Sequence, residues 1–141
     1  MLRKYFGFLV FLMLPIMMWG ADYNTFTNVL MPHDKNVTLV ASIEQDANHM
    51  VWIGTNCGLF SYNGYSVKYH SREACDNYIH CLKDIPGEAL YVGTEQGLWV
   101  YDYRHSVFLP QLDGSPSGIR AMIKDGDSLW LGSSTGLYSF N

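Results

Sequence analysis

The fold is decided by the segment VWIGTNCGLF at residues 51–60, because the chain contains it three times. The second copy is LYVGTEQGLW at residues 90–99, and the third is LWLGSSTGLY at residues 129–138, so the copies start 39 residues apart. One aromatic residue and two glycines recur in phase: Trp52, Gly54 and Gly58, then Tyr91, Gly93 and Gly97, then Trp130, Gly132 and Gly136. A repeat of about 40 residues is typical of propeller blades.

Each copy has the pattern of a β-hairpin. Residues 51–53 are β-branched and aromatic, and their unbroken apolar run indicates a strand buried on both faces. Thr55–Gly58 predicts a tight turn in which the final glycine takes positive φ and the threonine hydroxyl bonds to the turn backbone. Residues 59–62 return as the paired strand. We expect the recurring aromatic residue to pack between neighbouring sheets.

Two further strands complete each unit. We predict the first strands at Thr38–Glu44, Tyr78–Lys83 and Gly118–Lys124, each ending near an aspartate-containing turn at Asp46, Asp84 or Asp125. The last strands are expected at Ser66–His70 and Ser106–Leu109. Four short strands in about 40 residues make a propeller blade. The predicted fold is therefore all-β, a partial β-propeller of about three four-stranded blades at residues 37–75, 76–115 and 116–141, the last one incomplete.

The first 36 residues precede the repeats. Arg3 and Lys4 are followed by uncharged, mostly apolar residues 5–20, a run shorter than a membrane-spanning helix requires. Residues 1–21 are therefore predicted to form a helical secretory signal peptide, with an uncleaved signal anchor as the alternative, so the rest of the chain is exported. In the segment 22–36, residues 26–31 are in phase with the last strand of a blade. We predict a strand there that closes the propeller ring, with a simple spacer as the alternative.

The composition excludes several classes of protein. An apolar fraction of 48% and an aromatic fraction of 15% exclude a disordered chain. The net charge of −4 comes without a basic patch, so no nucleic-acid partner is expected. No motif for a phosphate, a metal hydrolase or a nucleophilic serine occurs, so we expect neither cofactor nor catalysis. Asp46, Asp84 and Asp125 are interpreted as turn residues rather than as acid–base groups.

One polar cluster and three cysteines invite other interpretations. The cluster contains the thiol and imidazole groups that zinc prefers, but its spacing matches no known site, so a polar loop is the favoured interpretation. Its members are His70, Cys75, Asp76, His80 and Cys81. An odd number of cysteines in an exported chain allows one disulfide, and Cys57 with Cys75 is the pair that could share one face of a propeller. Unpaired thiols are the favoured interpretation.

Ligand contacts are expected on the loops at one end of the blades, because loops on a rigid scaffold carry variable functional side chains. The candidates in the repeat turns are Asn56, Glu95, Gln96 and Ser133, together with the loops 71–77 and 111–117. Aromatic platforms for a sugar are available at Tyr65, Tyr69 and Tyr103. Most aromatic residues are nevertheless expected in the core between blades.

The repeats resemble the two-component-regulator propeller repeat. The resemblance rests on residues 42–46 (SIEQD), 51–55 (VWIGT) and 58–64 (GLFSYNG), and it extends over residues 26–141. It implies the periplasmic sensor region of a hybrid two-component histidine kinase of gut Bacteroidetes, a region that senses oligosaccharides. The family's remaining blades, membrane helix and kinase are not found in this sequence, so the chain is expected to carry no signalling output itself. A dimer is considered only for the full-length form. The alternatives are a fragment of an exported propeller lyase or hydrolase and a secreted scaffolding or adhesion repeat protein.

The chain length agrees with a fragment of a ring. Without the first 21 residues about 120 remain, which is about three repeats, whereas four to eight blades close a propeller. The chain is therefore expected to end before the fourth strand of its third unit. Because an open stack of blades exposes apolar faces, we predict that residues 22–141 alone aggregate or form oligomers.

Overall fold

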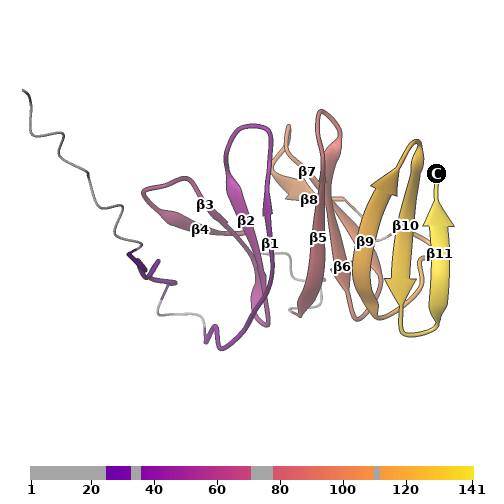
Figure 1. Ribbon diagram of the computed structural model, residues 1–141, viewed down its shortest axis with the longest axis horizontal. Coiled ribbons are helices and arrows are strands. Elements are labelled where there is room, and N and C mark those ends of the chain that lie inside the picture. The colour runs from indigo at the N-terminus through magenta and orange to yellow at the C-terminus, as the bar shows by residue number, and fades with distance from the viewer. Residues whose placement is uncertain (1–24, 33–35, 71–77, 110–111) are drawn as a thin grey trace, which may run out of the picture.

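The computed structural model describes residues 25–32, 36–70, 78–109 and 112–141. These residues form three antiparallel sheets of four, four and three strands, which stand side by side (Figure 1). The all-β prediction is confirmed, and the three sheets match the three repeats in number. The signal peptide predicted at residues 1–21 lies outside the described residues. Within the described ranges, no helix is long and apolar enough to cross a bilayer.

The strands follow one another in sequence order within each sheet. The first blade contains β1 (Val40–Gln45), β2 (Val51–Thr55), β3 (Gly58–Tyr62) and β4 (Val67–His70). The second contains β5 (Ile79–Ile85), β6 (Ala89–Thr94), β7 (Leu98–Asp102) and β8 (Val107–Phe108). The third contains β9 (Ile119–Asp125), β10 (Ser128–Ser133) and β11 (Gly136–Phe140). Most of the predicted strand boundaries agree with these bounds within two residues.

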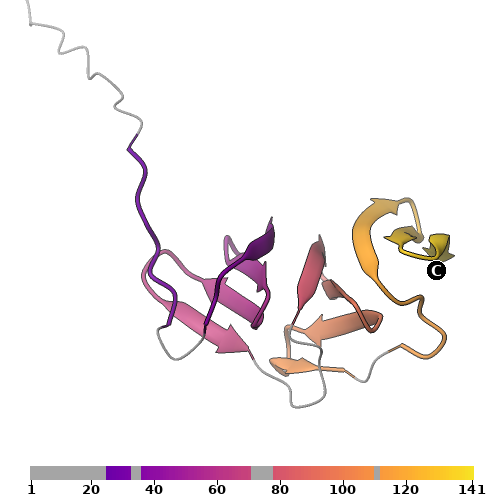
Figure 2. The same cartoon turned by 90° about the horizontal axis from the view of Figure 1, so that it is seen from below.

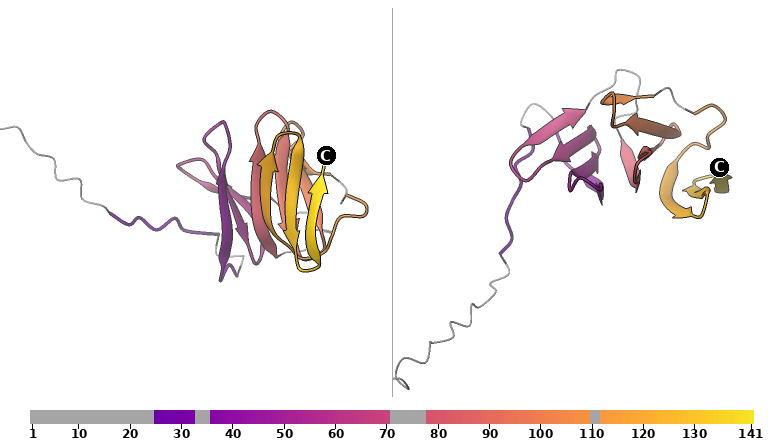
Figure 3. Two further views of the ribbon diagram at one scale, coloured as in Figure 1. Left: turned by 45° about the vertical axis from the view of Figure 1, so that its right-hand side comes forward. Right: turned by 90° about the horizontal axis from the view of Figure 1, so that it is seen from above.

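The three blades are arranged along an arc. Seen from below, β1 and β5 lie on one side of the arc, and β4 and β8 lie on the opposite side (Figure 2). The views in Figure 3 show the same order, with the first strand of each blade beside the first strand of the next. The first strands are therefore the inner strands of a propeller segment, and the last strands are its outer strands.

In the first two repeats, the first glycine is the contact point between blades. A Cβ atom added at Gly54 in β2 would lie 2.6 Å from Cγ2 of Ile79, the first residue of the next blade. A Cβ atom at Gly93 in β6 would lie 2.8 Å from Cγ2 of Ile119, the first residue of the third blade. At both positions the isoleucine of the following blade occupies the space of the missing side chain.

Two apolar cores fill the space between the blades. In the first, Trp52 packs beside Leu82 and Leu90 of the second blade and is 4% exposed. Its indole Nε1 donates a hydrogen bond of 2.9 Å to the buried carboxylate of Asp46. In the second core, Tyr91 lies with Leu129 of the third blade. The prediction that the recurring aromatic residue packs between sheets is thus confirmed for Trp52 and Tyr91.

The structure differs from the sequence predictions at three places. Trp130 is only half-buried, because it lies on the face of the third blade that points away from the second. No strand forms over the described residues 25–32, and Phe26 is fully exposed, so ring closure by this segment stays a prediction. Asp84 lies within β5, whereas Asp46 follows β1, so these two aspartates are not equivalent turn residues.

Candidate functional site

The inner strands carry a β-bulge at the same position in every blade. The pairing with the second strand skips one residue in each case: Ala41 in β1, His80 in β5 and Arg120 in β9. Bulges redirect a side chain and are frequent beside functional sites. The bulges lie next to the turns that contain the predicted ligand residues, since Val40 pairs with Thr55 and Ile79 pairs with Thr94.

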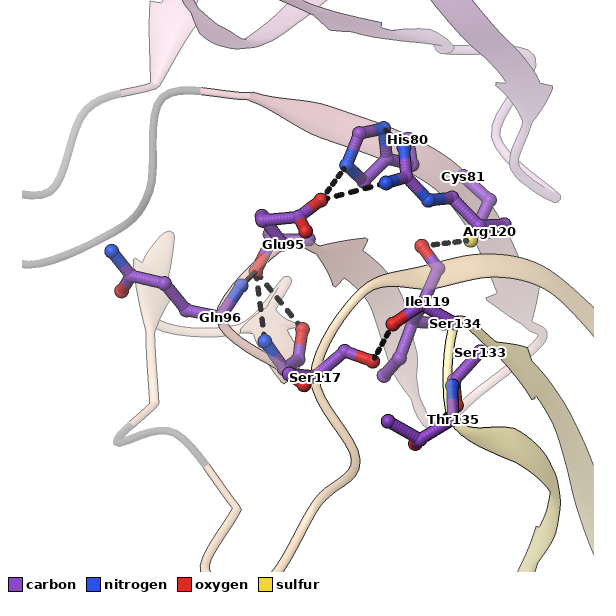
Figure 4. A network of polar contacts seen from close by, with 12 residues as sticks. His80, Cys81, Glu95, Gln96, Ser117, Ile119, Arg120, Ser133, Ser134 and Thr135 are labelled. Atoms are coloured by element: carbon purple, nitrogen blue, oxygen red, sulfur yellow. Dashed lines mark hydrogen bonds and ion pairs between the residues drawn. The ribbon is translucent and has the colours of Figure 1, made fainter.

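Two of the bulge residues meet a predicted ligand residue in one cluster, which we call the rim cluster: His80, Glu95 and Arg120 (Figure 4). Oε2 of Glu95 lies 2.9 Å from His80 Nε2 and 2.9 Å from Nη2 of Arg120. Nη1 of Arg120 lies 3.1 Å from His80 Nδ1. The cluster therefore joins the second blade to the third.

The two contacts of the imidazole ring assign different roles to its nitrogens. A guanidinium has no acceptor, so Nδ1 of His80 must accept the hydrogen bond from Arg120. Nε2 of His80 then carries the hydrogen and donates it to Glu95. The opposite charges of Glu95 and Arg120 cancel within the cluster. The histidine side chain is 10% exposed, whereas those of Glu95 and Arg120 are 55% and 54% exposed and available to a ligand.

Backbone contacts hold Glu95 beside the third blade. The carbonyl oxygen of Glu95 accepts a 2.7 Å hydrogen bond from the amide of Gly118, and the carbonyl of Gly118 accepts one of 3.0 Å from Ser134. Gly118 has a φ of 62°, and a Cβ atom there would lie 2.5 Å from Oγ of Ser134. Glycine suits position 118, because it takes this φ without strain and leaves room for the Ser134 side chain, and its amide holds the turn that contains Glu95.

The other three predicted ligand residues are placed differently. Asn56 Oδ1 accepts the amides of Thr38 and Leu39, so this side chain organises the segment before β1. Ser133 Oγ bonds to the backbone of its own turn at Thr135 and Gly136. Gln96 is exposed, and its side chain points away from the rim cluster (Figure 4). A ligand role thus remains predicted, and within this set Glu95 has the most suitable surroundings. The loop 71–77 lies outside the described residues.

Two of the three tyrosines predicted as sugar platforms pack against other aromatic rings instead. Tyr69 stacks on Phe60 with ring centroids 4.9 Å apart. Tyr103 contacts Trp52 and donates a 2.6 Å hydrogen bond to Asp84. Only Tyr65, which is 95% exposed, presents its ring to solvent.

The sequence did not predict a buried polar network between the first two blades. Nε2 of His70 lies 2.8 Å from Oγ of Ser61, and its Nδ1 lies 2.8 Å from the hydroxyl of Tyr101. Burial, with a smaller effect of the Lys68 charge, lowers the pKa of His70 from 6.5 to about 4. A serine beside a neutral histidine has the geometry of a nucleophile and its base, but Ser61 is 4% exposed and closed to a substrate. The network therefore joins blades, and the cavity of about 410 Å³ beside it reaches His70 but not Ser61.

The cysteines behave as separate thiols in the described part of the chain. Cys57 is half-buried, and its Sγ lies 3.0 Å from the carbonyl oxygen of Asn36. Cys81 is buried, and desolvation raises its pKa to about 12. Cys75 and Asp76 lie outside the described residues, so the structure does not decide between a Cys57–Cys75 disulfide and the unpaired thiols that the sequence favours. Among the residues that the structure describes, no three histidine, cysteine or carboxylate side chains gather into a metal site.

Comparison with known proteins gives relatives among solved structures. No protein-family model and no curated protein matches the chain. Two structures of the extracellular domain of BT4673 from B. thetaiotaomicron are each 37% identical to this chain, with a TM-score of 0.74. That protein is described in one structure as a putative one-component system and in the other as a putative hybrid two-component system. Each match covers 84% of this chain, which spans only 16% of that one. A chain of a mitotic checkpoint complex shares the fold alone. It is 16% identical with a TM-score of 0.58, and the match covers 82% of this chain and 42% of that one.

Proposed function

We propose that this chain is the ligand-sensing propeller segment of an exported sensor protein, because it resembles the extracellular domain of a hybrid two-component system. The observation that carries the proposal is the 37% identity over 84% of the chain. The resemblance predicted from the three repeats is thereby confirmed. The segment forms part of a larger sensor, because it spans 16% of its relative. Further blades and a kinase region are the partners that such a sensor requires.

The ligand we propose is an oligosaccharide that contacts the rim cluster. Glu95 uses Oε2 for both of its side-chain contacts, which leaves Oε1 as an acceptor. Arg120 supplies five N–H hydrogens, so donors remain beyond its contacts with His80 and Glu95. Adjacent hydroxyl groups offer both a donor and an acceptor, which matches this pair. The cancelled charge favours a neutral sugar over a uronic acid.

The chain senses in this proposal and leaves the signalling output to the larger protein. A ligand at the rim cluster would contact two blades at once, because His80 and Glu95 belong to the second blade and Arg120 belongs to the third. A shift between blades is a mechanical change that the rest of a receptor could transmit. The site would lie outside the cytoplasm, in the periplasm, as the extracellular position of the relative suggests.

Calorimetric titration of the complete extracellular protein that contains this chain tests the proposal. Neutral and acidic oligosaccharides of several linkages are titrated into the wild type, Glu95→Gln and Asp127→Asn. Asp127 is an exposed aspartate in the β9–β10 turn, at the other end of the blade, and serves as the matched control. We expect a neutral oligosaccharide to bind, with about tenfold weaker affinity in Glu95→Gln, which corresponds to about 1.4 kcal/mol, and no change in Asp127→Asn. Uniform absence of binding would favour the scaffolding alternative.

A further inference from the structure

The rim cluster occurs at only one of the two blade contacts that the structure describes. Between the second and third blades it consists of His80, Glu95 and Arg120. At the contact between the first and second blades, Ala41 occupies the bulge position of His80, and Asn56 occupies the turn position of Glu95. Neither of these two residues carries a charge or titrates. The cluster therefore belongs to one blade pair and is not part of the repeat that builds the propeller.

His80 is the buried member of the cluster, and it contacts both of the exposed members. Its side chain is 10% exposed, and the centroid of its ring lies 4.6 Å from that of Tyr78. Nε2 lies 2.9 Å from Oε2 of Glu95, and Nδ1 lies 3.1 Å from Nη1 of Arg120. Each ring nitrogen thus holds one charged side chain in place.

Glu95 and Arg120 are the charged groups that bond to this ring among the described residues. The strands packed against β5 are β1, β2, β6 and β9, and β2 contains no ionisable residue. Other ionisable side chains on β5 and these strands bond elsewhere: Glu44, Cys81, Lys83, Asp84, Tyr91 and Lys124. The protons on His80 and the charges of its two partners are therefore directly coupled.

We infer that His80 is the specificity-determining residue of the proposed sugar site, on which this step rests, because a second proton on its ring releases Arg120. A ring with both nitrogens protonated has no acceptor, so it cannot receive the hydrogen bond from the guanidinium. Two cations then face each other across the 3.1 Å contact and repel. Histidine is the side chain that ordinarily changes charge between about pH 5 and 8.

The second proton changes both the position and the number of the charges. Nε2 is a donor with one ring proton or with two, so the contact with Glu95 is kept. Arg120, whose side chain is 54% exposed, can turn toward solvent. With one ring proton the formal charge of the cluster is zero, and with two it is +1. A guanidinium that faces solvent binds a carboxylate through two parallel hydrogen bonds. The cluster should therefore prefer a neutral sugar above the titration range of His80 and an acidic sugar below it.

Histidine NMR on the complete extracellular protein that contains this chain tests the protonation without a ligand. The histidines are labelled with carbon-13 at Cε1, and the His80 signal is identified by its loss in His80→Asn. Asparagine offers a side-chain oxygen in the place of the Nδ1 acceptor and does not titrate. His105→Asn is the matched control, because this histidine is 73% exposed and bonds to Asp102 at the β7–β8 turn. We expect the His80 signal to titrate between about pH 5 and 8 in the wild type and in the control, and the Nε signal of Arg120 to move with it.

Glucose and glucuronate, added at about pH 7.5 and about pH 5.5, test the choice of ligand on either side of the ordinary histidine range. The two sugars differ by one carboxylate, which stays ionised at both pH values. Their dissociation constants are measured from the Nε signal of Arg120, which Arg120→Lys identifies. We expect the preference for glucuronate over glucose to rise about tenfold at the lower pH in the wild type and in His105→Asn. The preference should stay constant in His80→Asn.

A His80 signal that does not titrate in this range would overturn the inference, and so would an equal change of preference in the wild type and in His80→Asn. If neither sugar moves the Arg120 signal at either pH, while the His80 titration still moves it, the sugar site and the choice of ligand are wrong. The release of Arg120 by a proton would then stand without them. Circular dichroism checks the fold of each variant, and His80→Gln replaces His80→Asn if the latter is unfolded.

Discussion

Gly93→Ala is the substitution that best tests how the blades fit together. The added methyl group would lie 2.5 Å from Sγ of Cys81 and 2.8 Å from Cγ2 of Ile119, and 3.2 Å from the carbonyl oxygen of Ile119. The backbone oxygen cannot turn away as a side chain can. At Gly132 the same methyl group meets Ala121 Cβ at 3.6 Å, an ordinary contact, which makes Gly132→Ala the matched control.

The two substitutions should change stability in opposite directions. Overpacking a core costs about 1–3 kcal/mol of stability. Replacing glycine by alanine stabilises the fold by about 0.4–1 kcal/mol, because it lowers the conformational entropy of the unfolded chain. Gly93→Ala should therefore lower the free energy of unfolding by about 1–2 kcal/mol. Gly132→Ala should leave it unchanged or raise it by about 0.4–1 kcal/mol, provided that the chain is dilute enough to be monomeric.

Urea unfolding followed by tryptophan fluorescence measures the difference as a shift of the midpoint at constant slope. The double variant Cys81→Ala/Gly93→Ala should lose less stability than the sum of the two single variants, because the methyl group then occupies the space of the thiol. Equal effects at Gly93 and Gly132, or strict additivity with Cys81→Ala, would refute the proposed close approach of the blades.

Three further predictions concern buried polar groups. Because the pKa of His70 is lowered from 6.5 to about 4 in the folded chain, the unfolded state binds the proton more readily. Stability should therefore fall as the pH drops from 6.5 to 4, and this contribution should level off below that range. Thermal unfolding measured at several pH values should show a shallower dependence of stability on pH in His70→Gln than in the wild type. Trp52→Phe removes the hydrogen bond to buried Asp46 and should cost about 1–3 kcal/mol in chemical denaturation; no loss would show that water replaces the indole. Iodoacetamide at pH 8 should label Cys57 well before Cys81, whose pKa of about 12 keeps it a thiol, and peptide mapping reads this out.

The repeat allowed most of the fold to be predicted, because it fixes properties local to each hairpin. The turn glycines Gly58, Gly97 and Gly136 have the predicted positive φ, at 111°, 149° and 143°. Thr55 and Thr94 bond through their hydroxyls to the backbone of their turns, as expected. These features depend on residues a few positions apart, so a single sequence contains the information.

The rim cluster could be predicted only in part, because it depends on how blades meet. Glu95 was a candidate from its place in a repeat turn. The sequence places its partner His80 only in a cluster that resembles a metal site, and it gives no sign of Arg120. The bulges that redirect both side chains leave no mark in the hydrophobic pattern. The equivalent turn position predicts that Asn56 also faces a ligand. Its side-chain oxygen instead accepts hydrogen bonds from Thr38 and Leu39, which lie 18 and 17 residues earlier in the chain. Polar side chains in equivalent turns acquire different partners when the blades around them differ.

The central claim is that each blade places its first isoleucine on the repeat glycine of the blade before it. The rim cluster depends on this contact, because it joins the second blade to the third. Proton NMR with labelled isoleucine methyl groups tests it directly. The account predicts nuclear Overhauser effects from the γ2 methyl of Ile79 to the α protons of Gly54, and from that of Ile119 to those of Gly93. Absence of both effects, with the isoleucine methyl groups in contact only with their own sheet, would contradict it.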